Sequence, residues 1–142
     1  MRGEPIKLVD GGAQKRSFTY VTDGIDALVK IIDNKNEIAN GKIYNIGNPK
    51  NNYSIRELAT MMLDLARQYP EYADTAAKVK VLETTSGEYY GKGYQDTQHR
   101  VPKITNTMTD LDWEPTVKFE DALRGIFEAY RSDVAEARKL MD

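Results

Sequence analysis

The pattern of apolar and polar residues predicts several short strands. Ile6 to Val9 alternates and runs into the turn Asp10-Gly11-Gly12, as a strand does before a reversal of the chain. Similar short runs of β-branched, aromatic and leucine residues are expected to form strands at 18–21, 43–47 and 79–82.

Three segments carry apolar residues at helical spacing. In the first, Thr22 is the expected N-cap. Its apolar stripe is formed by Ile25, Leu28, Val29 and Ile32. The second helix begins with the capping-box sequence Ser54 to Glu57 and keeps one apolar face until Pro70. The third is expected over 119–141. The chain is therefore predicted to be a mixed α/β domain spanning residues 1–142.

Two smaller features fall between the second and third of these helices. Ile104 to Leu111 predicts a short helix, followed by Asp112, Trp113 and Pro115 at its end. Because a single tryptophan at such a position is more often buried than free to stack on a ligand, Trp113 is expected to be a packing residue.

Composition excludes several classes of function. The net charge of -2 argues against a nucleic-acid groove, and the absence of cysteine rules out disulfides and thiolate metal sites. His99, the one histidine, cannot hold a zinc ion alone. No apolar run reaches the roughly 20 residues needed to cross a bilayer, so no membrane partner and a cytoplasmic location are expected.

The segment 89–102 is the strongest candidate for binding. It combines three tyrosines with lysine, histidine and arginine, together with two glycines and Pro102. Such side chains can stack on a base and grip a phosphate, although a solvent-exposed loop has a similar composition. A second basic cluster, Gln14-Lys15-Arg16, follows a glycine-rich turn far upstream and favours the interpretation as an anion site.

Several motifs occur in an order that resembles a known family. They are G-x-x-Q-x-R-x-F-x-Y-V-x-D from Gly11, Ile43 to Asn48, the helix start 54–58, and Leu-Asp-Trp-Glu-Pro at 111–115. In this order they resemble the C-terminal part of extended short-chain dehydrogenases that act on nucleotide sugars, the NAD-dependent epimerase/dehydratase family. Tyr89 to Asp96, with His99-Arg100 and Pro102, is more narrowly similar to the bacterial UDP-glucuronic acid oxidative decarboxylases that serve aminoarabinose modification of lipid A.

The resemblance implies roles for four residues. Arg100 matches the arginine proposed as the catalytic acid near the sugar, although a guanidinium is a poor proton donor at neutral pH and an electrostatic clamp is the alternative. Tyr94 matches a tyrosine at the uridine. Arg16, with Lys15 as a weaker candidate, matches the basic position near the nucleotide phosphates. The implied ligand is a UDP-sugar, and the implied cofactor of the complete enzyme is NAD.

Two elements of such enzymes do not occur in this sequence. It contains no G-x-x-G-x-x-G dinucleotide turn and no Tyr-x-x-x-Lys pair. We therefore expect an N-terminal Rossmann portion to be the partner that holds NAD, and we expect no turnover by this chain alone; a homo-oligomer is also left open. The alternatives are a non-catalytic module that binds a nucleotide or packs against a partner, and part of a related nucleotide-sugar epimerase or dehydratase.

Overall fold

The chain divides into two compact units in the computed structural model, which describes residues 3–93, 96–131 and 133. The first unit comprises residues 1–14, 54–98 and 120–142, and the second comprises residues 15–53 and 99–119. Helices and short strands occur in both units, which confirms the expected mixed α/β class. No helix among the described residues combines the length and the apolar composition that a membrane span requires.

A parallel pair of strands opens the first unit. β1 (Ile6–Val9) lies beside β4 (Val81–Thr84), with Ile6 opposite Val81, and leads into the short 3-10 helix η1 (Asp10–Gly12). β1 was predicted as observed. β4 begins two residues later than the predicted segment 79–82.

The helices of the first unit follow their local signals. In α2 (Ile55–Ala66), the Ser54 hydroxyl accepts a hydrogen bond from the Glu57 amide (3.1 Å) and the Glu57 carboxylate accepts one from the Ser54 amide (2.7 Å). The predicted capping box is confirmed. The prediction that Pro70 ends this helix was wrong, because α2 already ends at Ala66. Pro70 occupies the first turn of α3 (Pro70–Lys78), where its missing amide costs nothing.

Aromatic side chains from α3, its N-cap Tyr69 and a later helix form part of the core of this unit. The ring of Phe127, on α6 (Phe119–Ala129), stacks on Tyr69 at 5.8 Å and meets Tyr72 edge-on at 5.3 Å. Leu123 is buried as the predicted stripe of this helix requires, whereas Ile126 and Tyr130 are exposed. The expected continuation to 141 lies largely outside the described residues. The short helix α4 (Ser86–Tyr90) completes the unit.

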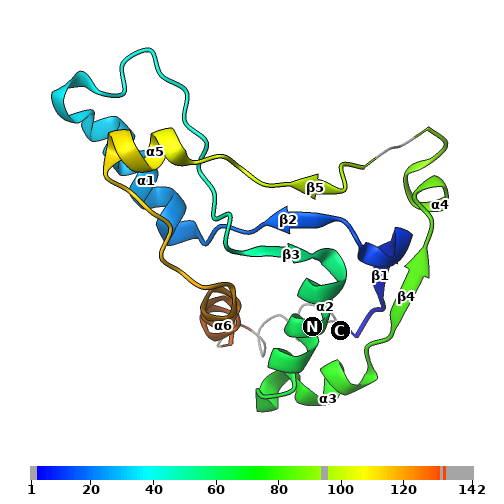
Figure 1. Cartoon of the computed structure of the whole chain (residues 1–142). Coiled ribbons are helices and arrows are strands. Elements are labelled where there is room, and N and C mark those ends of the chain that lie inside the picture. The colour runs from blue at the N-terminus through cyan, green and yellow to red at the C-terminus, as the bar shows by residue number, and fades with distance from the viewer. Residues whose placement is uncertain (1–2, 94–95, 132, 134–142) are drawn as a thin grey trace. The chain divides into compact units, whose positions relative to one another are not determined.

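The second unit is built on a three-stranded sheet in which β2 lies between the other two strands (Figure 1). The strands are β2 (Lys15–Ser17), β3 (Asn52–Ser54) and β5 (His99–Arg100). The predicted strand at 18–21 is therefore displaced toward the N-terminus, because the available partner β5 pairs with residues 15 and 16. Val21 instead begins a helix.

Two helices of this unit lie side by side in Figure 1 and bury a small core between them. They are α1 (Val21–Asp33), which is followed by the 3-10 helix η2 (Lys35–Glu37), and α5 (Thr105–Leu111). The buried residues of this core are Ala27, Ile104, Leu111 and Trp113. The short helix and the packing role of Trp113 are confirmed.

The apolar stripe predicted for α1 is not the face that is buried. Ile25, Leu28, Val29 and Ile32 are 50–81% exposed, whereas Asp23 and Ala27 are buried and Ile31 packs partly against the core. The sequence thus identified an amphipathic helix correctly but assigned its buried face wrongly. The reason is that the residues packed against α1 are reached from positions 23, 27 and 31, which share a different side of the helix.

Asp23 connects the start of α1 to the segment after α5. Its carboxylate accepts hydrogen bonds from the Thr116 amide (3.2 Å), the Thr116 hydroxyl (3.2 Å) and the Val117 amide (3.1 Å). Its carbonyl accepts one from the Trp113 indole (3.0 Å). The N-cap of α1 is Tyr20, with no side-chain cap, so the prediction of Thr22 was wrong. A buried acid here organises a loop rather than a helix end.

Candidate anion-binding site

The pairing of β2 with β5 brings the two basic clusters of the sequence together. The strands are parallel, with Lys15 opposite His99 and Arg16 opposite Arg100. Because opposite residues of neighbouring strands project to the same face of a sheet, Arg16 and Arg100 project together. Three of the four predicted site residues are thus adjacent, and Tyr94, the fourth, lies outside the described residues.

Arg16 and Arg100 line a hollow of about 510 Å³ in the second unit. Besides these arginines, its lining consists of Ser17, residues 44–47 and residues 101–103. It contains three cationic side chains, those of Arg16, Arg100 and Lys103, and no carboxylate among the residues described. A concave surface with this balance of charge favours an anionic ligand.

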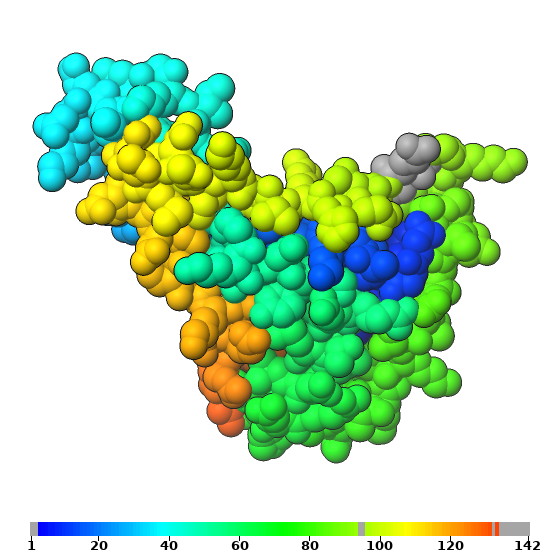
Figure 2. Space-filling view, viewed as in Figure 1, coloured from blue at the N-terminus to red at the C-terminus, as the bar shows by residue number. Residues whose placement is uncertain are grey.

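The two arginines differ in their surroundings. Arg16 is half-buried, and its Nη1 donates a hydrogen bond to the Lys15 carbonyl at 2.8 Å, which restrains the guanidinium. Arg100 is exposed, and within the described part of the chain its guanidinium has no hydrogen bond or ion pair. Only its backbone is held, by the Ser17 hydroxyl that donates to the Arg100 carbonyl at 3.4 Å. The side chain of Arg100 is therefore available to a ligand. Figure 2 shows the yellow-green segment around Arg100 on the surface beside the blue residues of β2.

The opposite wall of the hollow is the segment 43–47, which was predicted to be a strand and is not one. Its contacts run through side chains: Asn45 Nδ2 donates to the Lys103 carbonyl (3.1 Å), and the Thr107 hydroxyl donates to the Asn45 carbonyl (2.7 Å). A β-carbon on Gly47 would stand 2.5 Å from Cγ of Pro102. These contacts, rather than a strand ladder, fix the width of the hollow.

Sequence reasoning missed the contribution of this wall. Tyr44, Asn45 and Gly47 were interpreted only as parts of a strand, and Lys103 was not considered. The usable signal was the Gly47-Asn48-Pro49 turn, which marks a close approach of the backbone to a neighbour. His99 is the β5 residue beside Arg100 and is not among the residues that line the hollow.

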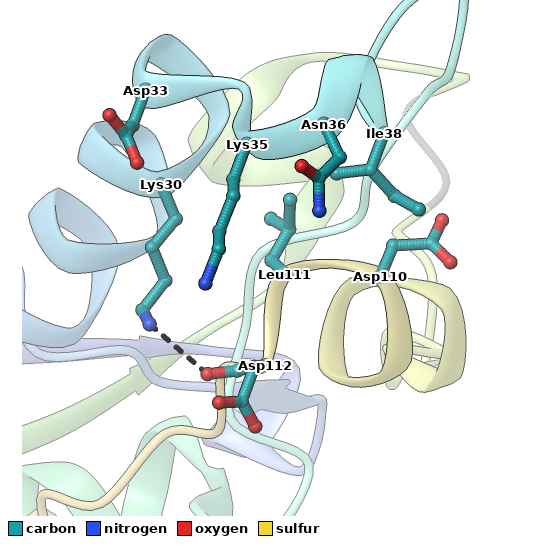
Figure 3. A pocket seen from close by; sticks show the side chains of 8 residues that line it. All are labelled: Lys30, Asp33, Lys35, Asn36, Ile38, Asp110, Leu111 and Asp112. Atoms are coloured by element: carbon teal, nitrogen blue, oxygen red, sulfur yellow. Dashed lines mark hydrogen bonds between the residues drawn. The ribbon is translucent and has the colours of Figure 1, made fainter.

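A second hollow in the same unit, of about 450 Å³, carries charges of both signs (Figure 3). Lys30 Nζ donates to the carbonyl of Asp112, the C-cap of α5, at 3.1 Å, and Figure 3 shows Lys35 directed toward the same region. A lysine at a helix C-terminus stabilises the partial negative charge of the last carbonyls. This hollow is explained by helix capping. Among the described residues no group of three or more acidic or histidine side chains is placed to hold a metal ion.

Asp110, also at the second hollow, ties α5 to the chain after η2. Its Oδ2 accepts hydrogen bonds from Lys42 Nζ (2.8 Å) and from the Tyr44 hydroxyl (3.1 Å). The hydrogen bond from Lys42 is the main cause of a lowered pKa for the Asp110 carboxyl, whereas burial and the bond to Asp110 raise the pKa of Tyr44. A carboxyl whose pKa is lowered by folding stabilises the fold at any pH above its ordinary pKa. This contribution is lost as the pH falls through the lower pKa of the folded state.

This tether yields a prediction about pH. As the pH falls below 3.8, the ordinary pKa of an aspartic acid, the hydrogen bonds from Lys42 and Tyr44 to Asp110 should weaken. The amides of segment 38–44 should then be less protected from hydrogen exchange. Lys42→Met should raise the pKa of Asp110 toward its ordinary value in a carboxyl NMR titration. Lys30→Met is the matched control, because Lys30 bonds Asp112 and not Asp110. An Asp110 titration that is the same in all three proteins would contradict the assignment.

Comparison with known proteins agrees with the resemblance of the motifs. Residues 1–47 match the family model described as NAD dependent epimerase/dehydratase family. The structure is similar to that of the PbgP3 protein from Burkholderia pseudomallei, with 62% identity, a TM-score of 0.85, and coverage of 96% of this chain and 37% of that one. The comparisons support the NAD-dependent epimerase/dehydratase family.

Two more distant structures have the same fold. UDP-glucuronic acid 4-epimerase from Bacillus cereus, solved with UDP-glucuronic acid and NAD, is 22% identical at a TM-score of 0.72, over 92% of this chain and 36% of that one. dTDP-glucose 4,6-dehydratase from Bacillus anthracis, solved with NAD, is 20% identical at a TM-score of 0.65, over 92% and 36%. The chain spans little more than a third of the length of these three proteins, and NAD is present in the latter two structures.

Proposed function

We propose that this chain binds the UDP-sugar substrate of an NAD-dependent UDP-glucuronic acid oxidative decarboxylase. The observation that carries the proposal is the register of β2 and β5, which pairs Arg16 with Arg100 at a hollow whose described lining contains no carboxylate. Guanidinium groups bind phosphate and carboxylate oxygens in pairs, and two of them on neighbouring strands, about 4.8 Å apart, can contact adjacent groups of one ligand. The motif 89–96 with His99-Arg100 supports the decarboxylase in particular.

The proposed roles follow the position of each side chain. Arg16, restrained by its bond to the Lys15 carbonyl, is proposed to hold the diphosphate, with Lys15 contributing charge. Arg100, whose side chain is available, is proposed to face the sugar and its carboxylate. Tyr94 is proposed at the uridine from the motif alone. In this arrangement Arg100 stabilises negative charge on the sugar. We therefore prefer the role of an electrostatic clamp for Arg100 over that of a proton donor.

NAD belongs to the proposal only through the complete enzyme. There it would accept hydride from C4 of the sugar, after which the carboxylate on C5 leaves as carbon dioxide. The sequence contains neither a dinucleotide turn nor a Tyr-x-x-x-Lys pair, so its residues do not fit NAD and we derive no step through it. The contribution of this chain to the reaction is the binding and orientation of the UDP-sugar.

The partner that would hold NAD is proposed to be an N-terminal Rossmann portion. The exposed stripe of α1 supports the existence of such a partner. Its four large apolar side chains are 50–81% exposed, and the hydration of an apolar face of this kind is unfavourable. Soluble proteins usually cover such a face with another element.

Titration with UDP and with UDP-glucuronic acid tests the proposed function. Arg16→Ala should weaken the binding of both ligands by about tenfold or more, and Arg100→Ala should weaken the binding of UDP-glucuronic acid by a similar factor while changing that of UDP less, since each removes a charge-assisted contact worth about 1.5–3 kcal/mol. Arg67→Ala is the matched control, because Arg67 is an exposed arginine whose ion pair with Asp64 lies on α2 and its C-cap. Calorimetry or NMR provides the affinities. Equal affinity for UDP and uridine, or an equal loss in the Arg67 variant, would reject the proposal.

A further inference from the structure

We propose that Lys103 is a specificity-determining residue of the same site, which holds the carboxylate of a uronic acid together with Arg100. The inference rests on the proposed function, since it takes UDP-sugar binding in this hollow as given. Lys103 was assigned no role by the sequence motifs. The structure provides three observations that concern its position, its charge and its distance from the arginine pair.

The backbone of Lys103 is fixed although its side chain is exposed. Its carbonyl accepts the hydrogen bond from Asn45 Nδ2 at 3.1 Å. The residue before it, Pro102, is in close contact with Gly47, and the residue after it, Ile104, is buried in the core of the unit at 8% exposure. Anchored on three sides, the lysine projects from a defined point on the rim of the hollow, which limits the entropy lost when its ammonium binds a ligand.

The charge of Lys103 is not compensated within the described part of the chain. Its ammonium forms no hydrogen bond or ion pair there, and the hollow that it lines contains two arginines and no carboxylate. Arg100 and Lys103 are exposed cations on one concave surface and repel one another, and an anion placed between them lowers this cost. A diphosphate held at Arg16 would leave these two charges to a second anionic group of the ligand.

Distance along the chain separates Lys103 from the arginine pair. It lies three residues beyond Arg100, in a stretch that Pro102 biases toward an extended conformation, so the two Cα atoms are up to about 10 Å apart. Arg16 and Arg100, by contrast, are neighbours across the sheet. This arrangement suits a ligand with a second anionic group beyond its diphosphate. In UDP-glucuronic acid that group is the carboxylate, whereas UDP-glucose has a neutral hydroxymethyl group in the same place.

The test compares these two ligands on the chain itself. Wild type should bind UDP-glucuronic acid more tightly than UDP-glucose. Lys103→Gln should weaken binding of UDP-glucuronic acid by about five- to tenfold, because it removes one charge-assisted contact, and should change UDP-glucose affinity by less than about twofold. Lys103→Arg should restore most of the preference. Lys50→Gln is the matched control, an exposed lysine that lines a different hollow of the same unit.

The outcomes separate this inference from the proposed function. If wild type binds both ligands but Lys103→Gln weakens both equally, the lysine contacts the diphosphate and the carboxylate assignment is overturned. If Lys103→Gln changes neither affinity, the inference is overturned while UDP-sugar binding stands. If wild type binds neither UDP-sugar, the proposed function is rejected and this inference with it.

Discussion

Replacing Asp23 with alanine should destabilise the second unit by about 3–5 kcal/mol, the largest effect expected of any single substitution considered. The carboxylate is 6% exposed and accepts hydrogen bonds from the amides of Thr116 and Val117 and from the Thr116 hydroxyl. Alanine would leave these buried donors without an acceptor. The free energy of unfolding from urea denaturation, followed through the fluorescence of Trp113 in the same unit, measures the loss.

Two further variants make this result specific. Asp26→Ala removes an exposed acid from the same helix and should change the free energy of unfolding by less than about 0.5 kcal/mol. The free energy of unfolding of Asp23→Asn should lie between those of wild type and Asp23→Ala. The amide oxygen of asparagine can still accept a hydrogen bond, whereas its NH₂ group faces another donor. If Asp23→Ala were as stable as Asp26→Ala, the proposed anchoring of the 113–117 segment would be wrong.

Gly47→Ala should narrow or displace the hollow and weaken UDP binding. The added β-carbon would lie 2.5 Å from Cγ of Pro102, a rigid ring that cannot rotate away, so one wall must shift. Overpacking of this kind costs about 1–3 kcal/mol, and the displaced wall carries Val101 to Lys103. We therefore expect both a lower free energy of unfolding and a UDP affinity reduced by at least about fivefold, since displaced contacts lose charge-assisted bonds.

Gly24→Ala is the control for the backbone change. A β-carbon there meets nothing within 4 Å, and the position lies within α1, where alanine is the better helix former by up to about 1 kcal/mol. Its stability should be unchanged or raised, and its UDP affinity should equal that of wild type. Gly47→Ala with normal UDP affinity would show that the 43–47 segment does not shape the site.

The comparison of α1 with α2 explains which helices could be predicted in full. The start of α2 is set by hydrogen bonds between Ser54 and Glu57, three residues apart, so a local motif was sufficient. The existence of α1 was equally clear from its spacing. Its buried face was not clear, because that face is set by the contacts of Ala27 and Ile31 with Trp113 and Leu111, which lie 80 or more residues later in the chain. The apolar stripe showed only that the helix is amphipathic, and its four residues are exposed.

The candidate site shows the same division. Residue type and motif were sufficient to predict Lys15, Arg16 and Arg100 as candidates for anion binding. The folded structure was needed to show that these residues are adjacent, that segment 43–47 forms a wall rather than a strand, and that Lys103 joins them. Pairing of β2 with β5 is a non-local event, fixed by hydrogen bonds between strands far apart in sequence, and short strands carry little register information of their own.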